Sequence, residues 1–272
     1  MGVGLMVMRF TCFKDCPPIA QLMEGTPTPA SLEVIPQKLS ALEMIDESLL
    51  RFASAWGRPY GFEQEQSGAI IQNLFPIKTN ETEQISSSSK INLEMHTETA
   101  FHPFRPQHII LLCLRGDDRA GTTYAVLDNI IGYLDKETIE ILHEPVFTTT
   151  LDKSFQNPNQ PDAIVTTPIL FNNGTSMTYD RVLMKPKTDY ADIALLALNR
   201  AIEQAKKVFT LSTGEVAIIE NWKVVHGRTP FAPKYDGTDR WLKRVMIRSA
   251  LPPARDLRFV GDDGSYVITT RF

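Results

Sequence analysis

The 272-residue sequence is poor in cysteine and has no long apolar segment. Its three cysteines, Cys12, Cys16 and Cys113, are too few for a disulfide framework, and the Cys12/Cys16 pair has no second pair with which to complete a zinc site. No apolar run reaches the roughly 20 residues that a bilayer-spanning helix needs. The first residues also lack the charged region and the cleavage site of a secretory signal. These absences predict a cytoplasmic protein without a membrane partner.

Two further features are missing, a basic patch and a zinc-protease motif. The formal net charge is −4, and no long run of lysine and arginine interrupts the sequence. A protein that binds nucleic acid needs concentrated positive charge against the phosphate backbone. A nucleic-acid partner is therefore not expected. The H-E-x-x-H pattern, which places two zinc-binding histidines on one helix face, is also absent.

The pattern of apolar residues predicts a mixed α/β fold. Hydrophobic residues make up 43% of the chain and charged residues 22%, which is ordinary for a globular domain. Helical spacing predicts helices over 36–56 and 192–208, whereas continuous or alternating apolar runs predict strands at 67–76, 108–115, 215–220, 222–226 and 240–248. No internal repeat or linker divides the chain. We therefore expect a single domain over 1–272, with strands closing on each other and helices outside.

Two segments are predicted to lie outside the regular structure. Residues 1–35 are expected to form an irregular N-terminal lead-in, because 17–35 are rich in proline and small residues. Residues 78–91 are polar and serine-rich, and they directly precede the candidate metal ligands. This segment is either a solvated linker or a lid loop that orders over bound substrate.

His96 and Glu98 are the first candidate metal ligands, and His226 follows far downstream. On an extended strand, residues i and i+2 project from the same face, so His96 and Glu98 can reach one ion together. His226 stands at the end of a predicted strand and can complete a set of two imidazoles and one carboxylate. Such a set leaves coordination positions open and is typical of non-haem Fe(II) oxygenases.

Other interpretations of these ligands remain open from the residues alone. A histidine near an apolar strand is often a hydrogen-bonded core residue, and His102 and His108 are close enough to His96 to be rival ligands. Neither has a carboxylate two residues away. Zinc and manganese accept the same ligand types, so the ligands alone do not select the metal.

Arginines on the last long predicted strand help to choose between these interpretations of the metal site. Arg240, Arg244 and Arg248 fall on one face of the segment 240–248. Guanidinium groups are costly to bury without anions. The face is therefore either exposed, with surface ion pairs, or part of a pocket in which bidentate guanidinium groups bind carboxylates.

Two blocks of the sequence carry a family resemblance. The segments 95–115, beginning Met-His-Thr-Glu-Thr-Ala-Phe, and 226–244, beginning His-Gly-Arg-Thr-Pro-Phe, resemble the clavaminate synthase-like group of Fe(II)/2-oxoglutarate oxygenases. Within that group the chain is similar to hydroxylases of free amino acids, such as asparagine oxygenase and the viomycin-pathway arginine β-hydroxylase. Similarity extends more thinly over about residues 61–248. The resemblance implies a double-stranded β-helix (jelly-roll) core flanked by helices.

The resemblance also implies cofactors and the residues that hold them. His96, Glu98 and His226 would ligate Fe(II) and form the catalytic centre. Arg240 would pair with the remote carboxylate of the cosubstrate 2-oxoglutarate, with O2 as the other co-reactant. The hydroxyl of Thr122 or Thr123 would assist that carboxylate, and alignment does not choose between these adjacent threonines.

Substrate contacts follow from the same resemblance. Arg244 would hold the α-carboxylate of a small amino-acid substrate. Asp180 resembles an acidic position near the substrate in relatives, although a turn or surface aspartate is an equally good interpretation. Gln72, on the strand before the lid loop, is a further candidate contact. Arg181 and Val182 follow Asp180 where relatives of the viomycin enzyme have an acidic pair, so the substrate side chain need not be cationic.

The implied activity is hydroxylation of an unactivated C–H bond, at C3, of a free L-amino acid or a close derivative, with succinate and CO2 as co-products. A glutamate at position 98 argues against a halogenase, which leaves that position vacant for chloride. Desaturation or cyclisation, and a carrier-bound or peptide substrate, remain alternatives within the family. A non-catalytic barrel that binds a small carboxylate and a zinc hydrolase are alternatives outside it. The sequence makes no prediction of the oligomeric state.

Overall fold

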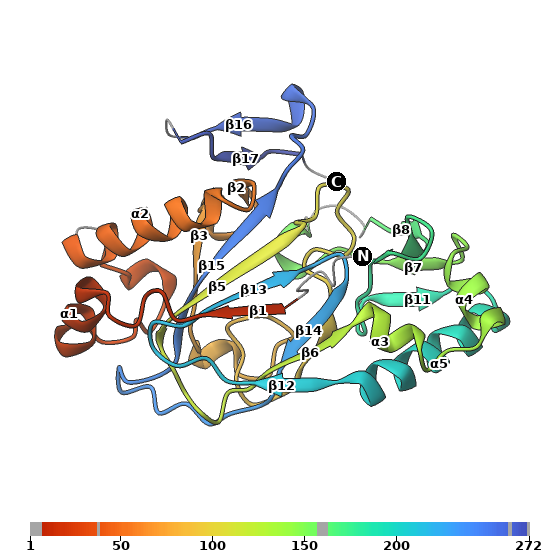
Figure 1. The fold of residues 1–272 in the computed structure, drawn as a ribbon, viewed down its shortest axis with the longest axis horizontal. Helices are drawn as coiled ribbons and strands as arrows, with labels where there is room; N and C mark the ends of the chain where they lie inside the picture. Colours follow the sequence, from red (N-terminus) through yellow and green to blue (C-terminus); the bar gives the residue numbers. More distant parts are fainter. Residues whose placement is uncertain (1–6, 37–38, 157–162, 261–262, 271–272) are drawn as a thin grey trace.

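The computed structural model describes residues 7–36, 39–156, 163–260 and 263–270. It is a mixed α/β structure in which strands outnumber helices and two sheets occupy the centre (Figure 1). Helices lie at the two ends of the long axis, α1 and α2 at one end and α3, α4 and α5 at the other.

The larger sheet contains eight strands, and the long strands β5 (His108–Arg115) and β15 (Trp241–Arg248) lie side by side at its centre. β3 (Ile71–Leu74) also pairs with β15. The remaining members, outward from this pair, are β13 (Val216–Glu220) and β1 (Val7–Phe10) on one side and β2 (Arg58–Phe62), β17 (Tyr266–Ile268) and β16 (Leu257–Phe259) on the other.

A four-stranded sheet lies opposite this one. Its order is β12 (Lys207–Phe209), β6 (Thr122–Val126), β14 (Val224–Arg228) and β4 (Leu93–His96), all antiparallel. A three-stranded sheet of β11 (Met184–Pro186), β7 (Phe147–Thr149) and β8 (Val165–Thr167) and the pair β9 (Leu170–Phe171) and β10 (Ser176–Met177) complete the strands.

Apolar side chains from both central sheets form one shared core. The larger sheet contributes residues such as Leu111 and Leu242, and the smaller one contributes Val224 and Tyr124. Because side chains alternate along a strand, this packing fixes which face of β14 and β15 points inward. Residues two positions away from Val224 and Leu242, including His226 and Arg244, therefore face the interior between the sheets.

Helices cover the outer faces of the sheets. α2 (Ser40–Ser54) buries Leu42, Ile45 and Leu49 against the larger sheet and packs with α1 (Pro17–Gly25). α5 (Asp189–Ala205), α3 (Leu127–Ile131) and α4 (Lys136–Leu142) cover the smaller sheet. Short 3-10 helices lie at Leu32–Val34, Gln66–Gly68, Lys78–Asn80, Lys153–Phe155 and Ala254–Asp256. In the described part of the chain, no helix has the length and apolar character that crossing a membrane demands.

The long predicted elements agree with the structure. The strand predicted at 108–115 is confirmed as β5, and the predicted helices 36–56 and 192–208 correspond to α2 and α5 with shifted ends. α5 begins three residues earlier than predicted because the Thr188 side chain accepts a hydrogen bond from Ala191 N and caps it there.

The irregular lead-in predicted for residues 1–35 is wrong in two of its described stretches. Residues 7–10 form β1, which pairs with β13, and residues 17–25 form α1. The two prolines at the start of the segment occupy the first turn of α1, where proline is tolerated because its missing N–H has no partner there. Residues 1–6 lie outside the described residues.

A buried ion pair joins α2 to β15. The Lys243 ammonium is 2.7 Å from Asp46 Oδ1, and side-chain exposures are 3% for Lys243 and 33% for Asp46. Asp46→Ala leaves the lysine charge buried without its partner, so we expect a loss of about 2 kcal/mol in the free energy of unfolding, below the roughly 3–5 kcal/mol of fully buried pairs. Urea denaturation measures this loss.

Two variants control that experiment. Glu47→Ala, at the neighbouring exposed position of α2, should change stability by less than about 0.5 kcal/mol. The double variant Asp46→Leu/Lys243→Met removes both charges and should recover most of the loss. Equal stabilities of the Asp46→Ala and Glu47→Ala proteins would contradict a stabilising role for the pair.

Candidate active site

Pairing of β14 with β4 brings the predicted metal ligands together. His226 lies directly opposite His96 in this antiparallel ladder, and the two imidazole centroids are 4.5 Å apart. Gly227 permits the close approach, because a Cβ atom there would lie 2.4 Å from Leu93 O. Two histidines separated by 130 positions in the sequence therefore share one site.

Glu98 reaches the same site from a turn. The prediction placed His96 and Glu98 together on a strand, but β4 ends at His96 and Glu98 lies in the turn that follows. The buried side chain of Asn221 holds this turn: Glu98 N donates to Asn221 Oδ1 at 2.7 Å, and Asn221 Nδ2 donates to Glu98 O at 3.2 Å. Asn221 was not predicted as a site residue, because its role depends on a contact across 123 positions.

The three side chains fit a divalent metal ion. Their ligand atoms all lie within 4.8 Å of one another, and no other such group of histidine, cysteine or carboxylate side chains occurs among the described residues. His96 Nδ1 is 2.7 Å from Glu94 O, which leaves Nε2 for the metal and fixes the ring orientation. Two imidazoles and one carboxylate, with positions left open, suit Fe(II).

The rival histidines lie elsewhere. His102 is fully buried among aromatic side chains, and its Nδ1 accepts a hydrogen bond from Phe104 N. Burial, reinforced by the nearby charges of Arg248 and Arg105, lowers the pKa of His102 to about 3, so it is neutral. His108 contacts Trp56 at the start of β5. Neither belongs to the metal-ligating group.

Arg244 connects the metal ligand Glu98 to Glu65. Its Nη1 is 2.7 Å from Glu98 Oε2, and its Nη2 is 3.4 Å from Glu65 Oε2. Arg244 is 7% exposed and Arg240 is 8% exposed. The alternative of a solvent-exposed arginine face is therefore wrong for these two residues.

Gln72 holds Arg244 in place. Its Oε1 accepts hydrogen bonds from Arg244 Nε and Nη2, and its Nε2 donates to Glu65 Oε2 at 2.9 Å. Both ends of the amide are thus engaged within the protein, which favours positioning of Arg244 over direct substrate contact. Glu65 was not predicted, because it lies in a turn without periodic pattern.

Carboxylates outnumber arginine in this part of the site. Burial opposes ionisation of Glu98, but Arg244 and the two histidines hold its pKa well below the usual range. Burial raises the pKa of Glu65, with partial compensation from Arg244. Asp152, which is partly buried and has no side-chain partner among the described residues, has a pKa raised well above normal by burial and by the nearby carboxylates of Asp180, Glu98 and Glu65.

Thr122 and Thr123 are adjacent on β6, so their side chains project from opposite faces of the sheet. Thr122 is buried and lies opposite Arg228 of β14, on the face that also carries His226. Thr123 points to the other face, where its hydroxyl contacts Met95 Sδ at 3.4 Å. Of the two threonines, only Thr122 therefore shares the interior face with His226 and Arg228. Burial lowers the pKa of Arg240, although Cys113 and Asp117 oppose this shift.

Asp180 lies beside the metal ligands but has a structural role. Its backbone forms an isolated bridge with His96, and its Oδ1 accepts hydrogen bonds from Val182 N and Leu183 N at 2.8 and 2.7 Å. These two hydrogen bonds stabilise a turn, as one of the two interpretations predicted, and they occupy one of the two carboxylate oxygens of Asp180. Arg181 points away from the site and pairs with Glu94 and Glu203.

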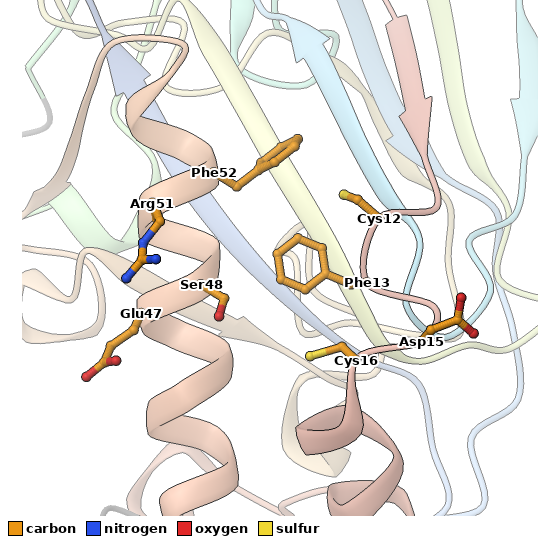
Figure 2. A pocket seen from close by; sticks show the side chains of 8 residues that line it. All are labelled: Cys12, Phe13, Asp15, Cys16, Glu47, Ser48, Arg51 and Phe52. Atoms are coloured by element: carbon orange, nitrogen blue, oxygen red, sulfur yellow. The ribbon is translucent and has the colours of Figure 1, made fainter.

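A separate hollow of about 570 Å³ lies on the outer side of the larger sheet, between the start of α1 and α2 (Figure 2). Cys12 and Cys16 both line it, and each is a free thiol. Phe13 and Phe52 contact each other there, with ring centroids 6.1 Å apart. The hollow contains none of the predicted site residues.

Comparison with known proteins gives the family. The sequence model that represents the taurine catabolism dioxygenase TauD, TfdA family matches residues 39–246 of the chain. The chain belongs to this family. The match spans both ligand blocks, from before Gln72 to beyond Arg244.

Two curated relatives are an asparagine oxygenase and a lysine hydroxylase. The chain is 36% identical to L-asparagine oxygenase of Streptomyces coelicolor over 77% of its own length and 63% of the relative's. It is 34% identical to L-lysine 3-hydroxylase of Catenulispora acidiphila over 70% of its own length and 55% of the relative's. The chain thus spans less than two thirds of these two relatives.

Solved structures agree with these relatives. Asparagine oxygenase in complex with Fe(II), 2S,3S-3-hydroxyasparagine and succinate superposes with a TM-score of 0.80 at 34% identity, covering 91% of this chain and 76% of that one. The non-heme iron oxygenase OrfP in complex with Fe and alpha-ketoglutaric acid superposes with a TM-score of 0.80 at 31% identity, covering 96% of this chain and 79% of that one.

The ligand geometry predicts the effect of removing one imidazole. His226→Ala leaves only two protein ligands, so Fe(II) affinity should fall by more than the roughly 10- to 100-fold that loss of an outer-shell partner costs. Anaerobic titration with Fe(II) measures the affinity, and His143→Ala, at an exposed histidine, is the matched control. Stoichiometric, tight iron in the His226→Ala protein would refute the assignment of this ligand.

Proposed function

We propose that the protein is an Fe(II)- and 2-oxoglutarate-dependent oxygenase that hydroxylates a free L-amino acid at C3. The observation that carries this proposal is the convergence of His96, Glu98 and His226 on one point. Two buried arginines belong to the facing sheet, Arg244 on β15 and Arg240 just before it. The family membership supports it, as do relatives that hydroxylate asparagine, lysine and ornithine or arginine.

The protein's own residues supply binding, orientation and exclusion of water. His96, Glu98 and His226 hold Fe(II), which with 2-oxoglutarate and O2 supplies the oxidising chemistry that inserts one oxygen atom and releases succinate and CO2. Arg240, with Thr122 nearby, binds the remote carboxylate of 2-oxoglutarate. Buried surroundings strengthen these charge-assisted hydrogen bonds and keep the cosubstrate oriented.

Arg244 binds the substrate carboxylate. Its guanidinium lies 2.7 Å from Glu98 Oε2, so a carboxylate that it binds would lie beside the metal ligands. Glu65, held beside Arg244 by Gln72, offers a negative charge for the substrate ammonium group. A free amino acid matches this adjacent pair of charges, whereas a carrier-bound aminoacyl thioester has no α-carboxylate for Arg244 to bind.

The charge of the site also bears on the substrate side chain, because carboxylates outnumber arginine near Arg244. Glu65 and Asp152 lie near the guanidinium of Arg244, and Asp180 lies near Asp152. Asp152 has no partner of its own among the described residues. A substrate with a cationic side chain compensates this surplus better than a neutral one. Lysine, ornithine and arginine therefore precede asparagine as candidate substrates, while Asp180 remains a predicted contact.

The proposal also includes a jelly-roll core, a single domain and a lid loop. Two facing sheets with a shared apolar core support a jelly-roll core within one domain. The lid loop at 78–91 is a prediction for the bound state; its described conformation is tied down by Ile77 N donating to Ser87 O and by buried Ser88 and Ser89. Desaturation or cyclisation of the substrate is distinguished from hydroxylation by product mass in the same assay.

An anaerobically reconstituted assay across the free L-amino acids tests the proposed activity. We expect succinate formation and a product heavier by one oxygen atom, with a basic amino acid turned over faster than asparagine because of the acidic surplus. A loss of two hydrogens would instead show desaturation or cyclisation. Failure to bind iron or to consume 2-oxoglutarate with any substrate would leave the non-catalytic barrel as the better explanation.

The two arginines should have separable effects. Arg240→Ala removes charge-assisted hydrogen bonds to 2-oxoglutarate, so its KM for 2-oxoglutarate should rise about 30-fold, equivalent to about 2 kcal/mol. Arg244→Ala should raise the KM for the amino acid by a similar factor. Iron content is the control, because Arg244 contacts the ligand Glu98. If each variant raised both constants equally at full iron loading, the separate roles would be wrong.

A further inference from the structure

Arg228 is a second buried guanidinium next to the proposed 2-oxoglutarate pocket. It is 4% exposed and lies two residues after His226 on β14, so both side chains face the interior. It lies opposite Thr122 in the β14–β6 ladder, and its charged neighbour is Arg240. The position thus borders each residue assigned to the remote end of 2-oxoglutarate.

Neither Arg228 nor Arg240 has an acidic partner within ion-pair distance among the described residues. Arg244, by contrast, contacts both Glu98 and Glu65. Two adjacent buried cations repel each other and lose hydration, and a bound anion is the usual compensation. This arrangement requires more negative charge than the surrounding protein provides.

Arg228 also holds the segment 86–89. Its Nη1 donates to Ser86 O at 3.2 Å and its Nη2 donates to Ser88 Oγ at 3.0 Å, while its guanidinium lies 5.1 Å from the centre of the Phe231 ring. Phe231 N in turn donates to Ser89 O at 2.8 Å. These acceptors are neutral, so they satisfy the donors of Arg228 without neutralising its charge.

Anchoring alone does not account for an arginine at this position. Neutral amide donors could bind a serine hydroxyl and a carbonyl without placing a second positive charge beside Arg240. The charge is useful when an anion occupies the pocket, and 2-oxoglutarate is a dianion whose remote carboxylate Arg240 is proposed to bind.

We propose that Arg228 is a second cationic determinant of 2-oxoglutarate binding and that, through its bonds to Ser86 and Ser88, it transmits occupancy of the pocket to the segment 86–89. This inference rests on the proposed function. It gives the segment 78–91 a physical link to the cosubstrate, because the guanidinium that the anion attracts is the one that holds Ser86 and Ser88.

Calorimetric titration of the anaerobic Fe(II)-loaded protein with 2-oxoglutarate tests the role of the charge. Arg228→Gln keeps a donor but removes the charge, and we expect its Kd for 2-oxoglutarate to rise about 10-fold, with a weaker dependence of Kd on salt. Arg228→Lys keeps the charge and should bind within about threefold of the original protein. Lysine binding as weakly as glutamine would overturn the inference.

Ser88→Ala is the matched control, because it removes one hydrogen bond of Arg228 and leaves the charge. Its Kd should stay within about twofold of the original value. A loss as large as that of Arg228→Gln would mean that Arg228 acts only as an anchor. Arg119→Gln, at an arginine whose side chain is 54% exposed and paired with Asp117, should leave the affinity unchanged.

Hydrogen exchange of residues 86–89 tests the link to the segment. Exchange should slow when 2-oxoglutarate binds the original protein, and the slowing should be lost in Arg228→Gln at saturating 2-oxoglutarate. Equal slowing in both proteins would overturn the link. If the original protein binds no 2-oxoglutarate, the proposed function fails with the inference; if it binds and Arg228→Gln binds equally well, only the inference fails.

Discussion

The antiparallel pairing of β14 with β4 is the constraint on which the candidate site depends. It places His226 opposite His96, and Gly227 allows the two strands to approach closely at that point. Glu98 then needs only the short turn after β4, which Asn221 holds through hydrogen bonds to both the N–H and the carbonyl of Glu98. A metal-ligating group thus results from backbone pairing and one buried amide.

Buried charge is the second property of the site. Arg228, Arg240 and Arg244 are all less than a tenth exposed, and Glu65, Glu98 and Asp152 lie near Arg244. Charges at such positions reduce stability unless they are paired, so a buried charge without a protein partner is a candidate site for an oppositely charged ligand. In this protein the arginines divide into two groups: Arg244 has carboxylate partners, whereas Arg228 and Arg240 have none among the described residues. This division is consistent with the proposed roles, in which Arg244 binds a zwitterionic substrate and the other two arginines bind a dianionic cosubstrate.

Much of the fold followed from patterns that are local in sequence. Continuous apolar character gave the bounds of β5, and helical spacing gave α2 and α5, because burial of one face requires that periodicity. The N-terminal prediction failed for a local reason as well. Proline was interpreted as a sign of irregular structure, whereas in the first turn of α1 it is compatible with a helix, and β1 is stabilised by pairing with β13 rather than by its own sequence.

The sequence by itself determined which candidate ligands the site could contain, because two histidines and one glutamate can bind a metal ion, and the arginines of 240–248 can bind carboxylates, in any fold. Only the tertiary structure decided which side chains meet. It selected Thr122 over Thr123 by strand alternation, excluded His102 by burial among aromatic rings, moved Glu98 from a strand to a turn, and added Glu65, Asn221 and Arg228. Those decisions depend on contacts between segments tens to hundreds of positions apart, and local sequence patterns carry no information about such contacts.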